Sequence, residues 1–179
     1  MGTSGQKPVL RFLLTASGLY LLWYILYDLW IHPAGWLDNF IIKNSILLSK
    51  FVLSFAGYGV FISDRLIGIE NSGGVWIGDP CNGVALFALF AGFIIAYPGK
   101  ASMKLLFIPL GILSIHLLNV LRIISLLLIQ NYAPSVLDFN HTYTFTFLVY
   151  GYIFILWMIW VKKITYQGTL SGDKQMKGT

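Results

Sequence analysis

The sequence predicts an all-α polytopic membrane protein with about four transmembrane helices, an outer interfacial amphipathic helix and a small β-hairpin. Apolar residues make up 57% of the 179 positions and charged residues only 11%, whereas about a quarter of the residues in soluble domains are charged. The mean hydropathy is +0.75. The segments apolar and long enough to span a bilayer are residues 12–31, 81–97, 105–130 and 142–161. We therefore expect a single membrane-embedded domain over residues 1–166.

Basic residues between the apolar segments predict how the chain is oriented in the membrane. They collect before the first span, between the second and third, and after the last: Lys7, Arg11, Lys100, Lys104, Lys162, Lys163, Lys174 and Lys177. Because cytoplasmic loops are rich in lysine and arginine, we expect both termini to lie in the cytoplasm. The membrane that we expect the protein to span is the cell inner membrane. The same bias explains the net charge of +5 without nucleic-acid binding. We expect no cleavable signal, and a disordered cytoplasmic tail over residues 167–179.

Residues 38–57 are apolar enough to span, but polar residues recur along one side at helical spacing. These residues are Asn39, Lys43, Lys50, Ser54 and Gly57. A stripe of this kind is typical of an amphipathic helix lying on a membrane surface, here the outer leaflet. In the alternative, the segment spans and the N-terminus lies outside, which places its basic residues on the wrong side. Both interpretations leave positions 81 and 141 outside.

Residues 58–78 contain short β-prone runs separated by turn residues. The runs GVFIS, RLIGIE and VWIG are broken by SDR and NSGG, which predicts a small β-hairpin on the outer surface. The hairpin leads into Asp79-Pro80-Cys81 at the start of the second span, and proline suits the first turn of a helix.

Cys81 is the only cysteine of the chain and lies where the hairpin meets the second span. One cysteine excludes an internal disulfide and a cysteine-based zinc cluster, so the thiol is either a small buried hydrophobe or a reactive group. We expect Cys81 to open the helix, so that free N–H groups and the positive helix end stabilise its thiolate. Gly83 allows close approach of the backbone or serves helix packing.

Arg122 lies in the third span, about two turns before its outer end. A charge at this depth normally faces the bundle interior or a wet cavity and indicates a functional site. The alternative is an arginine that snorkels outward or pairs with Asp28 or Asp138. Asn119, three residues earlier, could bind the same ligand or orient the guanidinium. His116 is better interpreted as a neutral core histidine bonded to another helix.

His141 opens the last span, at the same outer interface as Cys81. Alone, such a histidine is more often an interface residue than a base. The single cysteine, the deeply placed arginine and this histidine nevertheless come from three different helices, and a thiol, a base and a cation are what covalent acyl transfer requires. A metal site of His32, His116 and His141 would need side chains at unlike depths, so we expect no metal and no cofactor.

Three sequence blocks resemble the signatures of the exosortase/archaeosortase family of membrane cysteine transpeptidases. They are Cys81-Asn82-Gly83, Asn119-Val120-Leu121-Arg122-Ile123, and His141 at the start of the last span. Their order and spacing match, and the likeness covers residues 39–163. The family more commonly has serine where this chain has Asn82, and many members have additional N-terminal spans.

The resemblance implies a membrane cysteine protease or transpeptidase that cleaves, or cleaves and transfers, proteins at the outer face of the membrane. The implied substrates carry a C-terminal sorting signal made of a short motif, a transmembrane helix and a basic tail. Substrate proteins and membrane lipids are thus the expected partners. The implied catalytic residues are Cys81, Arg122 and His141, and the implied supporting or substrate-binding residues are Asn82, Gly83 and Asn119.

In the mechanism that we expect, Cys81 attacks a peptide carbonyl, His141 exchanges the proton and Arg122 stabilises the oxyanion. Alternatively, Cys81 and His141 form an ion pair and Arg122 binds the substrate. Two other functions remain open. One is a non-catalytic membrane assembly factor or transporter subunit, in which Arg122 binds a lipid headgroup or a partner helix. The other is a lipid-modifying acyltransferase that uses the same thioester chemistry.

Overall fold

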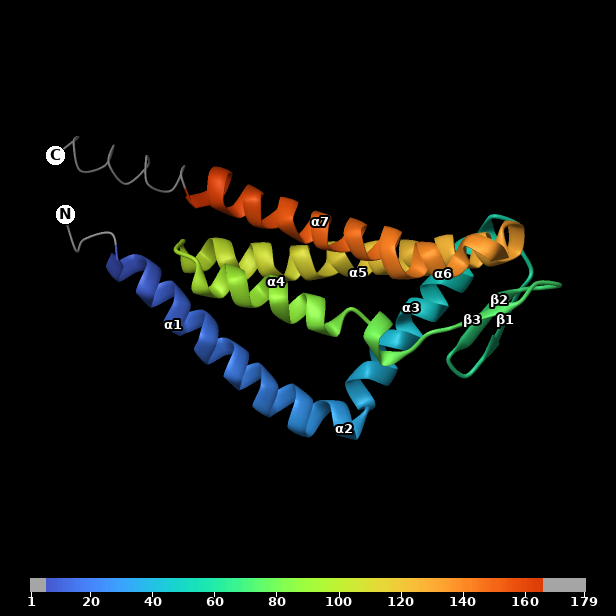
Figure 1. The fold of residues 1–179 in the computed structure, drawn as a ribbon, viewed down its shortest axis with the longest axis horizontal. Helices are drawn as coiled ribbons and strands as arrows, with labels where there is room; N and C mark the ends of the chain where they lie inside the picture. The colour runs from blue at the N-terminus through green and yellow to red at the C-terminus, as the bar shows by residue number, and fades with distance from the viewer. Residues whose placement is uncertain (1–5, 166–179) are drawn as a thin grey trace. The chain divides into compact units, whose positions relative to one another are not determined.

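The computed structural model describes residues 6–165 (Figure 1). The predicted disordered tail over residues 167–179 lies outside these residues. The helices are α1 (Gln6–Trp23), α2 (His32–Ala34), α3 (Trp36–Phe55), α4 (Val84–Ala96), α5 (Ala101–Tyr132), α6 (Leu137–Phe139) and α7 (Phe145–Ile159). The strands are β1 (Val60–Ser63), β2 (Leu66–Ile69) and β3 (Gly74–Trp76). Short 3-10 turns cover Asp79–Cys81 and Pro134–Val136, and π-helical turns cover Tyr24–Ile31, Asn140–Thr144 and Trp160–Thr165.

The predicted fold class is confirmed, because the described chain is largely helical and three of its helices are long and apolar enough to cross a membrane. These are the continuous helical runs Val9–Ala34, Ala101–Tyr132 and Pro134–Lys162. The predicted span over residues 81–97 is helical only over the 13 residues of α4. At 1.5 Å per residue, α4 is about 20 Å long, shorter than a hydrocarbon core of about 30 Å. The prediction counted residues 81–83 as helical, but Gly83 has φ 82 and interrupts the helix.

The chain divides into two compact units. One unit comprises Met1–Pro33, Ala85–Leu113 and Ile153–Thr179, and the other comprises Ala34–Val84 and Ser114–Tyr152. All of the predicted catalytic and supporting residues belong to the second unit, so the site can be described within it. The single domain over residues 1–166 stays a prediction.

In the first unit, aromatic rings and one lysine hold the helices. The Phe93 ring stacks on Trp157 with centroids 4.5 Å apart, and Phe107 lies 5.2 Å from Trp160. Lys104 Nζ donates hydrogen bonds to the carbonyls of Ile95 and Tyr97, at 2.8 and 2.7 Å. These carbonyls lie at the end of α4, where helical C=O groups lack intrahelical partners. Lys104 therefore caps α4, since a cation at this end also complements the helix dipole.

In the second unit, α3 and the sheet pack on the C-terminal part of α5. Their shared core contains Ile42, Ile46 and Leu53 from α3, Ile67, Ile69 and Ile77 from the sheet region, and Val120, Ile123, Ile124 and Leu127 from α5. Burying branched aliphatic side chains of this size stabilises each by about 1.5–3 kcal/mol relative to exposure. This core fixes the frame on which the candidate site is built.

The α3 helix has three different faces along its length. Its buried face carries Asp38, Ile42, Ser45, Ile46, Ser49 and Leu53. The predicted polar stripe, which includes Lys43 and Lys50, is exposed, and a stripe of exposed apolar residues lies beside it: Trp36, Phe40, Leu47, Phe51 and Phe55. Lysines beside aromatic and aliphatic residues are typical of a helix in a membrane interface. The helix itself is confirmed, and its place on the outer leaflet stays a prediction.

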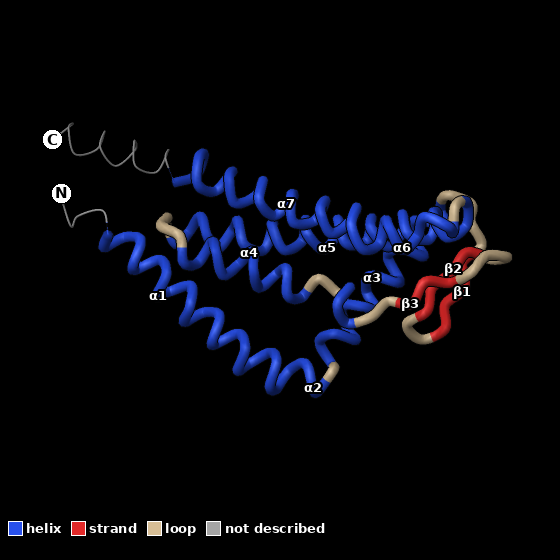
Figure 2. The backbone as a smooth tube through the Cα atoms, viewed as in Figure 1, coloured by secondary structure: helices blue, strands red, loops and turns tan. Residues whose placement is uncertain are grey.

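The predicted β-hairpin is confirmed, and a third strand extends it into a sheet of order β1-β2-β3 (Figure 2). All neighbours are antiparallel, with Phe61 opposite Gly68 and Ile67 opposite Val75. A Cβ atom at Gly68 would lie 2.3 Å from the Phe61 ring. Glycine at this position thus lets the Phe61 ring lie across the strand. From β3 the chain runs directly into the Asp79–Cys81 turn.

Candidate active site

Cys81 lies in a 3-10 turn, not in the first turn of a helix. The turn covers Asp79–Cys81, and the Cys81 N–H donates to the Gly78 carbonyl at 2.9 Å. The helix α4 begins three residues later, at Val84, whose N–H donates to Asn82 Oδ1 at 2.8 Å. The expectation that Cys81 opens the helix is therefore wrong. Gly83, at φ 82, adopts the left-handed conformation that separates the turn from the helix.

His141 and Arg122 both approach the Cys81 sulfur. Cys81 Sγ lies 3.4 Å from His141 Nε2 and 3.7 Å from Arg122 Nη2. His141 belongs to the π-helical turn Asn140–Thr144, and such turns frequently occur at functional sites because they shift side chains out of helical register. The structure thus brings together the thiol, imidazole and guanidinium that were predicted from the sequence. Their catalytic roles remain a hypothesis.

Arg122 is held close to the thiol without an acidic partner in its own unit. It makes no ion pair with Asp138 in the described part of the chain, although Asp138 was one of the acids considered for it. Its Nε is buried and lacks a hydrogen-bond partner among the described residues. An unmatched buried donor costs about 1–3 kcal/mol. The guanidinium therefore retains hydrogen-bonding capacity beside Cys81.

Asn119 holds the backbone of Cys81. Its Nδ2 donates to the Cys81 carbonyl at 2.8 Å, and its side chain is only 1% exposed. Its Oδ1 is buried and has no partner among the described residues. Asn119 was expected to orient Arg122 or to bind a ligand, and the structure gives it a different contact, with the backbone that carries the thiol. The donor contact also identifies which amide atom is the nitrogen.

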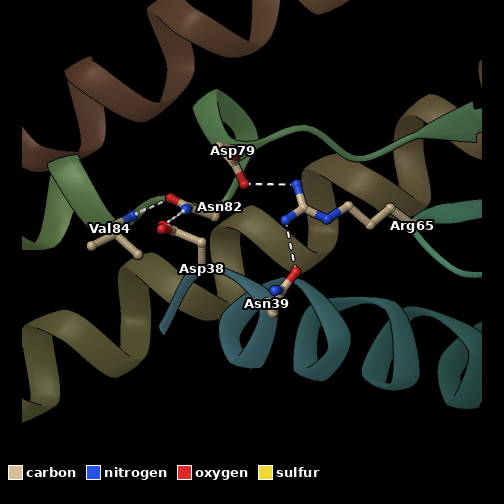
Figure 3. Close-up of polar contacts among 6 residues, drawn as sticks. All are labelled: Asp38, Asn39, Arg65, Asp79, Asn82 and Val84. Atoms are coloured by element: carbon tan, nitrogen blue, oxygen red, sulfur yellow. Dashed lines mark hydrogen bonds and ion pairs between the residues drawn. The ribbon is translucent and has the colours of Figure 1, made fainter. Parts of the chain in front are cut away.

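Asn82 uses both ends of its side-chain amide to hold the same turn. Its Nδ2 makes a short hydrogen bond to the Asp38 carboxylate, while its Oδ1 accepts the Val84 N–H (Figure 3). Asn82 and Asp38 are 3% and 1% exposed. Asn82, predicted as a supporting residue, therefore forms a buried link between α3 and the start of α4, directly after Cys81 in the chain.

On the other side of the turn, Arg65 links Asp79 to α3. Its Nη1 donates to Asp79 Oδ1 and its Nη2 to Asn39 Oδ1, both at 2.7 Å (Figure 3). Arg65, Asp38 and Asp79 were not predicted as site residues. The available signal was that Arg65 is an arginine in a short loop with acids on both sides of it in the sequence.

The remaining histidines lie in other environments. His116 Nε2 lies 2.9 Å from Asn44 Oδ1, on α3, which agrees with the interpretation of a core histidine bonded to another helix. His32 lies against Tyr27 in the first unit, with ring centroids 5.6 Å apart. The structure therefore supports His141, and not His116, as the imidazole beside Cys81.

Of the comparisons with known proteins, one identifies the family of the chain. No curated protein and no solved structure matched the chain. The sequence model of the transmembrane exosortases (Exosortase_EpsH) matches residues 3–161. This match includes the helical runs Val9–Ala34 and Ala101–Tyr132, all but the last residue of Pro134–Lys162, and every residue of the candidate site. The chain is a multi-pass membrane protein and belongs to the transmembrane exosortase family.

Proposed function

We propose that the protein is a membrane cysteine peptidase or transpeptidase that cleaves proteins carrying a C-terminal sorting signal. The single observation that carries this proposal is the contact of Cys81 Sγ with His141 Nε2 at 3.4 Å and Arg122 Nη2 at 3.7 Å. A thiol with a base and a cation in reach has the groups needed for nucleophilic attack on a carbonyl.

In the first half of the reaction, His141 Nε2 takes the proton of Cys81 and the thiolate attacks the substrate carbonyl carbon. A C–S bond forms, and the carbonyl oxygen becomes an oxyanion that Arg122 stabilises by charge and hydrogen bonding. When the C–N bond breaks, the imidazolium returns the proton to the leaving amine. The product is a thioester on Cys81, and the C-terminal part of the substrate departs.

In the second half, a nucleophile attacks the thioester and releases the thiol. Water gives hydrolysis, and an amine or another acceptor gives transfer, with His141 accepting the proton of the nucleophile in both cases. The site favours neither outcome by itself, because both pass through the same thioester.

We place the site on the extracytoplasmic side of the cell inner membrane. In the chain, α3 and the sheet directly precede Cys81. The support is the charge asymmetry of the sequence, since Lys100 precedes α5 and Lys104 lies in its first turn, both beyond the end of α4 that is farther along the chain from Cys81. The expected partners are substrate proteins with a short motif, a transmembrane helix and a basic tail, together with membrane lipids.

The test is mass spectrometry of the group bound to Cys81 when the reaction is slowed by His141→Ala or Arg122→Ala. The proposal predicts a polypeptide that ends at the cleavage site and is attached through a thioester. His116→Gln is the matched histidine control, because His116 bonds Asn44 and not the thiol. A lipid acyl group on Cys81 would instead indicate a lipid-modifying acyltransferase, and substrate processing without any adduct would favour an assembly factor.

A further inference from the structure

The hydrogen bonds around Cys81 form a bracket that begins and ends in one turn of α3. Asp38 and Asn39 are adjacent in the first turn of this helix. Asp38 bonds Asn82, which directly follows the cysteine. Asn39 bonds Arg65, which bonds Asp79, two residues before the cysteine. Figure 3 shows both arms, with Arg65 between Asp79 and Asn39, and Asn82 between Asp38 and Val84.

We propose that Asp38 and Arg65 are positioning residues that hold the Cys81 turn on α3 at the place where His141 and Arg122 reach the sulfur. This inference rests on the proposed function, because it assigns to the two residues the placement of the proposed nucleophile. Neither residue contacts the Cys81 thiol in the described structure. Both therefore act through the backbone on either side of it.

The burial of the Asp38 arm shows why this contact controls position. Asp38 and Asn82 are almost completely buried, and removing one partner of a buried hydrogen-bonded pair leaves the other unsatisfied, at about 1–3 kcal/mol. The carboxylate lies in the first turn of α3, where the positive end of the helix dipole stabilises an acid. A turn anchored in this way has few alternative positions.

Arg65 holds Asp79 and Asn39 at a set distance from each other. One guanidinium reaches Asp79 and Asn39 through different nitrogens, both at 2.7 Å, and the side chain of Arg65 is 19% exposed. The planar fork holds two partners at a set separation, whereas a lysine presents one ammonium group. Arg65 also follows β1 and precedes β2, so the sheet fixes its backbone.

The single cysteine allows a direct test, because alkylation of the whole chain by iodoacetamide reports only on Cys81. Alkylation rates are measured against pH in detergent for Asp38→Asn, Asp38→Ala, Arg65→Lys and Arg65→Gln. Asp64→Asn and Lys43→Gln are the matched controls in the same unit, since no hydrogen bond or ion pair of the described residues involves either side chain. Unfolding temperatures and alkylation after denaturation are measured in parallel.

We expect Asp38→Ala and Arg65→Gln to lower the native alkylation rate at pH 7 and substrate processing, by up to about a hundredfold if the thiol shifts by about 1 Å. The conservative variants Asp38→Asn and Arg65→Lys should recover part of the loss, because each keeps one of the original contacts. After denaturation, the alkylation rates of all variants should equal that of the denatured wild-type protein. If Asp38→Ala does not fold, the Arg65 series carries the test, because Arg65 is partly exposed.

Wild-type alkylation profiles and processing in folded Arg65→Gln, or in Asp38→Ala where it folds, would overturn the positioning proposal. Equal losses in the matched controls would also overturn it, since the effect would then be a general change of charge. These results are distinguishable from failure of the proposed function, because a separate variant, Cys81→Ala, tests that function. A Cys81→Ala protein that still processes substrate contradicts the nucleophile, whatever the bracket variants do.

Discussion

Asn119→Ala separates the placement of the Cys81 backbone from the stability of the fold. The substitution removes the 2.8 Å hydrogen bond from Asn119 Nδ2 to the Cys81 carbonyl. An unsatisfied buried carbonyl costs about 1–3 kcal/mol. The same substitution also removes Asn119 Oδ1, a buried acceptor that lacks a partner among the described residues, and this gain is of similar size. We therefore expect the free energy of unfolding to change by less than about 1.5 kcal/mol.

The rate of catalysis should not be compensated in this way. Only the lost hydrogen bond affects the position of the Cys81 thiol, whereas the removed Oδ1 atom does not. Freed at its carbonyl, Cys81 can move away from His141 and Arg122, and a displacement of about 1 Å costs about a hundredfold in rate. The assays are substrate processing and the iodoacetamide rate of Cys81, with thermal unfolding in detergent. Asn119→Asp is the matched variant, since an ionised carboxylate of the same shape only accepts hydrogen bonds and cannot donate to the carbonyl. Unchanged processing and alkylation in both variants would refute the reasoning.

Three further predictions test other parts of the account. Gly83→Ala should destabilise the protein by about 1–2 kcal/mol and impair processing, because Gly83 has φ 82, a left-handed conformation that alanine disfavours. Gly83→Asn should destabilise it less, and equal unfolding temperatures for the wild-type protein and both variants would contradict this prediction. Arg122→Lys should slow processing by about a hundredfold to a thousandfold, since an ammonium lacks the planar fork, and wild-type rates would exclude an oxyanion role. Reporter fusions should place Gly74 outside and Lys100 in the cytoplasm, and a cytoplasmic signal at Gly74 would contradict the topology.

The sequence was sufficient to predict the fold class because length and apolarity act locally. Three of the four predicted apolar runs form helices that meet the bilayer requirement by themselves, and the alternation of β-prone and turn residues predicts the hairpin. The start of α4 was predicted wrongly. Asn82-Gly83 carries a capping residue and a left-handed glycine, so the local signal for a break was present but was outweighed by the apolar run that follows.

The candidate site was predictable only where rare residue types marked it. A single cysteine and an arginine inside a span are conspicuous in an apolar chain, and the structure brings both together with His141. The bracket was not predictable, because it joins residues far apart in the sequence. Asp38 and Asn82 are separated by 44 positions, and Asn39 and Arg65 by 26. No local pattern distinguishes such acids and amides from ordinary polar residues of outer loops.

The central claim is that Cys81 is the nucleophile, and processing of substrate by Cys81→Ala and Cys81→Ser proteins tests it most directly. Both substitutions are small changes at a partly buried position, so both proteins should fold and reach normal levels in the membrane. We predict that both accumulate full-length substrate, because a serine hydroxyl is far harder to ionise than a thiol. Wild-type processing by Cys81→Ala at normal expression would contradict the covalent mechanism and would favour a non-catalytic assembly factor.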